Sequence, residues 1–118
     1  MPGLNGFPQQ ERLKRRQDFE AVYRSGRKRV GREFVCYVAR REGRGRRMGL
    51  SVSRKVGGAV VRNRVKRLIR EVYRTNRSGM ATDVDIVVVA RPAAAGLSYA
   101  ACSEALRKLW RASEVLRG

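Results

Sequence analysis

The segment that most restricts the fold of this chain is the apolar run VDIVVVAR at residues 84–91. A strand that is solvated on one face alternates apolar and polar residues, whereas a nearly continuous β-branched run is typical of a strand covered on both faces. Pro92 ends the run, because proline cannot donate to a strand ladder. The sequence therefore predicts a sheet in which this strand carries structure on each side.

Two further segments are predicted to be strands. EFVCYVAR (33–40) is rich in β-branched and aromatic residues, and MGLSVSR (48–54) alternates strictly between large apolar and small residues. In the first of these strands Tyr37 points away from Phe34. The connection RREGRGRR (40–47) is polar and contains glycine, so the two strands are expected to form an antiparallel hairpin. Its arginines either contact phosphates or only solubilise the turn.

Three helices are predicted. The first starts near Leu13, has Phe19 and Tyr23 on its apolar face, and stops at Gly26. The second covers 59–75. The third begins after Ser98, a good N-cap, and reaches about Leu116.

The resulting order is α-β-β-α-β-α, an α+β sandwich with one sheet. A chain of 118 residues with 42% hydrophobic residues fits one domain with a modest core. Residues 1–11 are rich in Gly, Pro, Asn and Gln, and we expect a mobile tail there, followed by the domain at 12–118.

The charge of the chain points to a polyanionic partner. Twenty-eight Lys and Arg against ten Asp and Glu give a net charge of +18, which repels itself in the compact state. Nucleic acid is the first candidate and an anionic membrane surface the second. The sequence contains neither a run of about 18 apolar residues nor a signal-peptide core, so we expect a cytoplasmic protein.

The chain is poorly equipped for catalysis on its own. It contains no histidine, which excludes His-based acid–base catalysis and His-containing metal sites. Asp83 and Asp85 are closely spaced, which is a weak metal signal and more often a feature of a strand edge. Cys36 and Cys102 lie far apart in apolar contexts, which favours buried thiols over a disulfide or a metal site.

The predicted helix VVRNRVKRLIREVYR (60–74) has two unlike sides. At roughly 100° per residue its apolar side chains form one stripe, made of Val61, Val65, Leu68, Ile69 and Val72. Four cations fall on the opposite side, namely Lys66, Arg67, Arg70 and Arg74, and Arg62 and Arg64 lie on the two flanks of the stripe. A solvated helix would intersperse acids for i,i+4 pairing, but Glu71 is the only acid in this segment. The pattern favours contact with nucleic acid, with Asn63 able to donate to phosphate or base edges.

Three aromatic side chains allow two interpretations. Phe19, Tyr23 and Tyr37 can all belong to the core. Alternatively, they can line the floor of a groove bordered by cations, which is how single-stranded nucleic acid is held without strict sequence readout. The sequence leaves this choice open.

The block GLSVSRKVGGAVVRNRVKRLIREVYR (49–74) resembles the signature of the bacterial ribonuclease P protein subunit. That family has a Ser-containing strand, a Lys-x-Gly turn and a helix opening with Arg-Asn-Arg followed by Lys-Arg. RLKRRQDFEAVYRSGR (12–27), FVCYVAR and DIVVVARPAA (85–94) agree with the same family in order. Gly58 departs from it, because the family often has Asn before the helix.

The resemblance implies a fold like the second domain of ribosomal protein S5, with an unusual left-handed βαβ crossover. It also implies a function. The family assembles with a large RNA subunit, which cleaves the 5′ leader from precursor tRNA with Mg²⁺ that the RNA holds. The protein would be inactive alone, with no intrinsic cofactor, no metal site and no other protein partner.

The resemblance also implies which residues bind each RNA. By motif match, the contacts with the RNA subunit fall on Arg62, Asn63, Arg64, Lys66, Arg67 and Arg70. Those with the leader fall on Phe19, Tyr23, Tyr37, Ser51, Ser53 and Lys55. The main rival interpretation is a small basic ribosomal or translation-associated RNA-binding protein with no hydrolytic role. A stand-alone nuclease is the more distant one.

Overall fold

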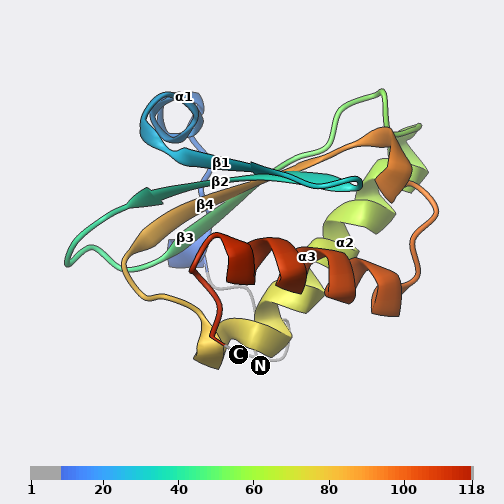
Figure 1. The fold of residues 1–118 in the computed structure, drawn as a ribbon. Helices are drawn as coiled ribbons and strands as arrows, with labels where there is room; N and C mark the ends of the chain where they lie inside the picture. The colour runs from blue at the N-terminus through green and yellow to red at the C-terminus, as the bar shows by residue number, and fades with distance from the viewer. Residues whose placement is uncertain (1–8, 118) are drawn as a thin grey trace.

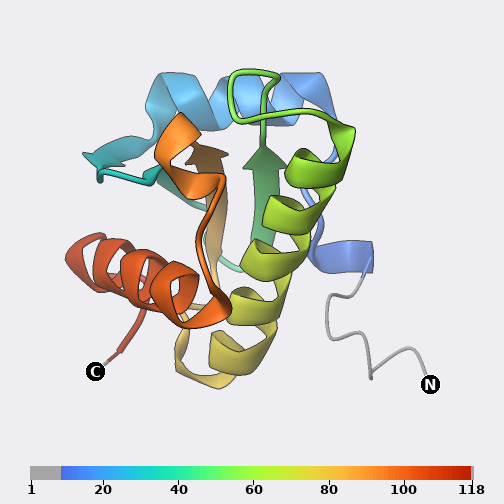
Figure 2. The ribbon, with the colours of Figure 1, turned by 90° about the vertical axis from the view of Figure 1, so that its right-hand side faces the viewer.

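A four-stranded sheet separates one helix from two others in the computed structural model, which describes residues 9–117 (Figure 1). The helix α1 lies on one side of the sheet, and α2 and α3 lie beside each other on the opposite side (Figures 1 and 2). The elements are α1 (Arg16–Ser25), β1 (Arg27–Val30), β2 (Phe34–Arg40), β3 (Arg47–Ser51), α2 (Ala59–Asn76), β4 (Val84–Ala90) and α3 (Tyr99–Ala112), with 3₁₀ turns at Gln9–Glu11, Arg77–Gly79 and Pro92–Ala94. The predicted α+β sandwich is confirmed.

The strand order is β1-β2-β4-β3, so the predicted hairpin between β2 and β3 is wrong. The strand β4 lies between them, antiparallel to β2 and parallel to β3. Its residues are buried on both faces, which favours the central position over an edge. The helix α2 therefore forms the crossover from β3 to its parallel neighbour β4. The left-handed sense of this crossover stays a prediction.

The sheet contains a strand that the sequence analysis missed. The strand β1, with the sequence RKRV, is exposed along its whole length and shows no apolar alternation. It is a strand because its backbone pairs antiparallel with β2 from Arg27 to Val30. The true hairpin of the fold is thus β1–β2, and β1 is an outer strand of the sheet.

Both faces of β4 are covered, as the apolar run at 84–91 predicts. Ile86 and Val88 join the larger core beneath α2 and α3, where Trp110 is fully buried. Val87 belongs to a smaller cluster with Val22 of α1. One face thus carries most of the core, while the other is covered by α1 and by Leu13 of the segment that precedes it.

The helix boundaries differ from the prediction at two ends. The helix α1 begins at Arg16, because Leu13 lies in an extended segment whose N–H donates to the carbonyl of Met48 (3.0 Å). Gly26 ends α1 as predicted, and its N–H binds the carbonyl of Val22. The helix α3 ends at Ala112 and stops short of Leu116, because the chain turns at Glu114, which has a φ of 62°.

The predicted tail at 1–11 falls mainly outside the described residues. Of that segment, Gln9–Glu11 form a 3₁₀ turn, and the carboxylate of Glu11 accepts hydrogen bonds from Tyr73 and Arg77. Contacts with the domain therefore begin before residue 12. None of the helices in residues 9–117 is long and apolar enough to cross a membrane.

Candidate nucleic-acid interface

The helix α2 packs through its predicted apolar stripe. Val65, Ile69 and Val72 are buried against the sheet, and Val61 and Leu68 lie partly buried at the border of the same core. The exposed residues Asn63 and Arg67 lie outside this stripe. The separation of an apolar side from a cationic side is thus present in the folded protein.

One of the predicted contact residues on α2 is occupied within the fold. The guanidinium of Arg64 donates to the carbonyls of Leu97 (2.6 Å) and Ala95 (3.4 Å). These carbonyls belong to the connection between β4 and α3, so Arg64 ties that connection to α2. Helical spacing places Arg64 on the flank of the stripe but cannot reveal this partner.

A basic groove runs between α2 and the segment that precedes α1. Lys66 and Arg70 face Arg12 and Lys14 across it. Apolar side chains complete its lining, namely Leu13, Met48 and Leu50. Burial lowers the pKa of Arg70, and the nearby charge of Arg12 lowers it further. Cations held this close to one another favour binding of an anion between them.

Arg12 and Lys14 were not among the predicted site residues, because their segment is predicted to be the start of the first helix. The only sequence signal for them is the basic run RLKRR at 12–16. It is the Leu13 N–H bond to Met48 that brings this run beside α2.

The start of α2 leaves backbone amides available. Its N-cap Gly58 has no side chain to bond the first-turn N–H groups. In the turn before it, Ser53 and Lys55 are exposed, and the Lys55 N–H donates to the Ser53 hydroxyl (3.3 Å). Free amides at a helix N-terminus attract anions.

The three predicted aromatic residues form one cluster on the α1 side of the sheet. The ring centroids of Phe19 and Tyr23 are 6.3 Å apart, and those of Tyr23 and Tyr37 are 4.9 Å apart with the rings edge to face. The side chain of Tyr23 is 39% exposed, while Phe19 and Tyr37 are half-buried against the smaller core. The aromatic cluster thus serves as core on its inner side and as accessible surface on its outer side.

Two small residues of β3 lie next to this cluster. The Phe19 ring occupies the space above Gly49, where even a methyl group would approach to within 2.6 Å of it. Burial raises the pKa of Tyr23, a hydrogen bond with the Ser51 side chain opposes the rise, and Tyr37 adds to it. Lys28 of β1, which the sequence analysis missed, extends over the Tyr37 ring at 5.7 Å from its centroid.

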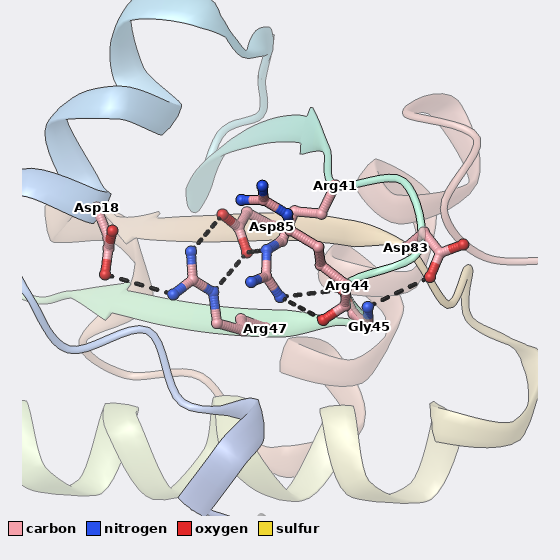
Figure 3. Close-up of polar contacts among 7 residues, drawn as sticks. All are labelled: Asp18, Arg41, Arg44, Gly45, Arg47, Asp83 and Asp85. Atoms are coloured by element: carbon pink, nitrogen blue, oxygen red, sulfur yellow. Dashed lines mark hydrogen bonds and ion pairs between the residues drawn. The ribbon is translucent and has the colours of Figure 1, made fainter.

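An ion-pair network fastens α1 and the 40–47 connection to the sheet (Figure 3). Arg47 donates to both oxygens of the buried Asp85, at 2.9 and 2.8 Å, and also contacts Asp18 of α1 at 3.3 Å. Arg41 reaches Asp85 from the connection itself (3.3 Å). The carboxylate of Asp83 accepts from the Gly45 N–H (3.3 Å). Asp85 therefore binds arginine side chains, whereas Asp83 binds a backbone amide.

The arginines of the 40–47 connection have structural roles in addition to charge. Arg46 donates to the Tyr73 hydroxyl (2.6 Å) and to the carbonyl of Ala81 (3.0 Å). Together with Arg41 and Arg47 it anchors the connection to α1, α2, β4 and the segment before β4. Arg40 and Arg44 are exposed. Neither of the two sequence interpretations foresaw this anchoring.

Potential metal ligands do not gather within residues 9–117, where no group of three or more Cys, Asp or Glu side chains converges. Cys36 and Cys102 are buried free thiols, as predicted. Burial raises the pKa of Cys36 to about 12 and that of Cys102 to about 11.

Comparison with known proteins identifies the family of the chain. The family model of ribonuclease P matches residues 7–114. The ribonuclease P protein component of Dictyoglomus turgidum is 41% identical over 118 residues, which cover 98% of each chain. That of Lachnoclostridium phytofermentans is 42% identical over 106 residues, 90% of this chain and 91% of the relative.

Solved structures give the same result. The RNase P protein of Staphylococcus aureus matches with a TM-score of 0.84 at 32% identity, over 91% of this chain and 98% of that one. The RNase P protein of Thermotoga maritima matches with a TM-score of 0.77 at 30% identity, over 92% and 99%. Sequence and fold agree over nearly the whole chain, which therefore belongs to the ribonuclease P protein family.

Proposed function

We propose that this ribonuclease P protein docks on the ribonuclease P RNA through α2 and holds the 5′ leader of precursor tRNA on the opposite side of the sheet. The observation that carries the proposal is the separation of two surfaces. One is the cationic side of α2 with the basic groove beside it. The other is the aromatic cluster, which α1 and β2 form on the opposite side of the sheet.

The α2 surface suits the phosphate backbone of a folded RNA. Arg67 and Asn63 are exposed, and Lys66 and Arg70 converge with Arg12 and Lys14 around the basic groove. Arginine forks fit phosphate oxygens in pairs. We assign docking contacts to Arg62, Asn63, Lys66, Arg67 and Arg70. Arg64 contributes by fixing the connection between β4 and α3 in place.

The aromatic cluster suits a single strand. Nucleobases stack on Phe19, Tyr23 and Tyr37 without regard to their sequence, because every base has a flat face. Ser51 adds a hydroxyl beside Tyr23, and Ser53 and Lys55 follow in the turn beyond β3. This assignment gives the leader a stacking floor and polar contacts at one end.

Cleavage itself belongs to the RNA subunit in this proposal, with Mg²⁺ that the RNA holds. Phosphodiester hydrolysis by a metal-bound water needs hard oxygen ligands. In this chain the carboxylates of Asp18 and Asp85 are paired with arginines instead. The protein lowers the repulsion between two polyanions and raises the affinity for substrate. We infer a cytoplasmic assembly without a further protein subunit.

Reconstitution tests the proposal. The purified protein should not cut precursor tRNA, whereas adding it to the ribonuclease P RNA should restore cleavage at Mg²⁺ concentrations too low for the RNA alone. Cleavage by the protein without RNA would identify a nuclease. Failure to enhance the RNA, with tight binding to ribosomal RNA in its place, would identify a ribosomal protein.

A further inference from the structure

Lys28 belongs to β1, a strand with no apolar alternation, and lies on the same face of the sheet as the aromatic cluster. In the β1–β2 register Lys28 stands opposite Tyr37, and its ammonium is 5.7 Å from the Tyr37 ring centroid. This distance is close to the outer limit of about 6 Å for a cation–π contact. Lys28 is exposed, and its ammonium therefore lies near the rim of the aromatic cluster.

The other two cations of β1 are on the far side of the sheet. Residues that stand opposite each other in neighbouring strands share a face. Arg29 pairs with Cys36 and Arg27 with Val38, and both partners belong to the core beneath α2 and α3. Arg27 also contacts Glu114, which follows α3, at 3.5 Å. Of the three β1 cations, only Lys28 faces the aromatic cluster.

We propose that Lys28 binds a phosphate of the precursor tRNA leader, so that the leader crosses from the aromatic cluster over the outer strand β1. This inference rests on the proposed function, because it takes the aromatic cluster to be the leader site. It adds a residue and a direction: the leader continues past Tyr37 toward β1.

The open edge of the sheet favours this path. Because β1 is the last strand on its side, no neighbouring strand blocks a chain that leaves the sheet there. Val30, two residues further along β1, faces the same side and is 60% exposed, which offers apolar surface for a sugar or base. A base stacked at the aromatic cluster places its phosphate at the border of the stack, where Lys28 provides a positive charge.

The test uses the holoenzyme reconstituted with ribonuclease P RNA and compares binding of precursor tRNA with binding of mature tRNA. Lys28→Met keeps the apolar stem beside Tyr37 and removes the charge. Its matched control is Arg29→Met, which removes the same charge from the adjacent position on the opposite face. Lys28→Arg restores the charge.

Lys28→Met should weaken binding of precursor tRNA by about tenfold or more, as loss of a charged hydrogen bond does, and leave mature tRNA unchanged. The salt dependence of precursor binding should fall by about 0.7 in slope, the value for one phosphate of a single strand. Arg29→Met should leave the preference for precursor intact, and Lys28→Arg should recover it. In a series of shortened leaders, the loss of affinity caused by Lys28→Met should disappear once the leader is shorter than one defined length.

Equal losses for precursor and mature tRNA, or equal losses in Lys28→Met and Arg29→Met, would overturn the inference while the leader site itself stands. If the unmodified holoenzyme showed no preference for precursor over mature tRNA, the leader site would fail, and this inference with it.

Discussion

Arg47 and Asp85 form a two-pronged ion pair on the α1 side of the sheet, with donor–acceptor distances of 2.9 and 2.8 Å. They stand opposite each other in the neighbouring parallel strands β3 and β4. Arg47 also contacts Asp18 of α1 (Figure 3). The pair thus joins the interior of the sheet to the helix that carries Phe19 and Tyr23. This part-buried pair is therefore one of the contacts that hold α1 against the sheet.

Removing the Asp85 carboxylate should be costly. Asp85→Ala removes the ion pair of Arg41 and leaves Arg47 with the weaker contact to Asp18, and loss of one partner of a buried pair costs about 3 kcal/mol. Urea unfolding should show a lower midpoint with an unchanged slope. Asp83→Ala is the control, since the Asp83 carboxylate accepts an exposed hydrogen bond from the Gly45 N–H, and its loss should cost less than about 1 kcal/mol. Equal losses would show that the network does not support the fold.

A second prediction concerns the dependence of stability on acid. Burial raises the pKa of Glu11, but hydrogen bonds from Arg77 and Tyr73 and the charges of Arg77 and Arg46 outweigh it, so the net shift is downward from 4.5. A carboxyl group whose pKa is depressed by folding stabilises the protein above its unfolded value and loses that contribution as pH falls through the folded value. The contribution of Glu11 is therefore complete above pH 4.5 and is lost below it.

Glu11→Gln should consequently lower the free energy of unfolding at pH 7 by about 1–3 kcal/mol, and the difference from the unmodified protein should shrink below pH 4.5. Unfolding measured from pH 7 to pH 3 checks this. Glu20→Gln is the comparison, because its pair with Arg16 is exposed on both sides and should be nearly neutral. A difference that stays constant with pH would contradict the pairing of Glu11.

The sequence specifies local elements of this fold better than their partners. The stripe on α2, the cap at Ser98 and the two-sided burial of β4 follow from periodicity and side-chain type, and all three are present. The strand β1 was missed because nothing in RKRV favours a strand except the neighbour that it pairs with. The strand β4 pairs with both β2 and β3, which lie far from it in sequence. Periodicity reports on single elements and does not encode such pairing.

In the candidate site, too, the sequence predicts local exposure better than it predicts contacts between distant segments. Spacing alone placed Arg67 on the exposed side of α2, where it lies. It could not identify the carbonyls that bind Arg64, because they come from a connection more than thirty residues away. Arg12 and Lys28 were missed for a related reason, since tertiary and strand pairing bring them to the basic groove and the aromatic cluster.

Arg64 and Arg67 should respond differently to substitution, although both belong to the Arg-Asn-Arg-x-Lys-Arg motif of α2. Arg64→Ala removes two hydrogen bonds to backbone carbonyls and should lower the free energy of unfolding by about 1–2 kcal/mol. Arg67→Ala should leave stability within about 0.5 kcal/mol. It should instead weaken binding of the ribonuclease P RNA and reduce the salt slope by about 0.9, the value for one lost phosphate contact.

Thermal unfolding and RNA titration at several salt concentrations separate these two effects. Lys108→Ala of α3 is a control for loss of one exposed positive charge away from α2. If Arg67→Ala and Lys108→Ala changed the salt slope equally, general charge attraction would account for binding and α2 would have no special place in it.

Tyr37 should matter for the substrate more than for assembly. Tyr37→Ala removes the ring that packs edge to face on Tyr23, and loss of one stacked base costs about 1–3 kcal/mol of binding. In the reconstituted holoenzyme, binding of precursor tRNA should weaken by this amount, with mature tRNA little affected. Tyr99→Ala is matched to it, since Tyr99 is 40% exposed on α3, on the opposite side of the sheet, and should leave both affinities unchanged. Tyr37→Leu retains apolar packing against the smaller core and thereby separates stacking from folding. Equal losses for both RNAs in Tyr37→Leu would assign Tyr37 to the core and remove it from the leader site.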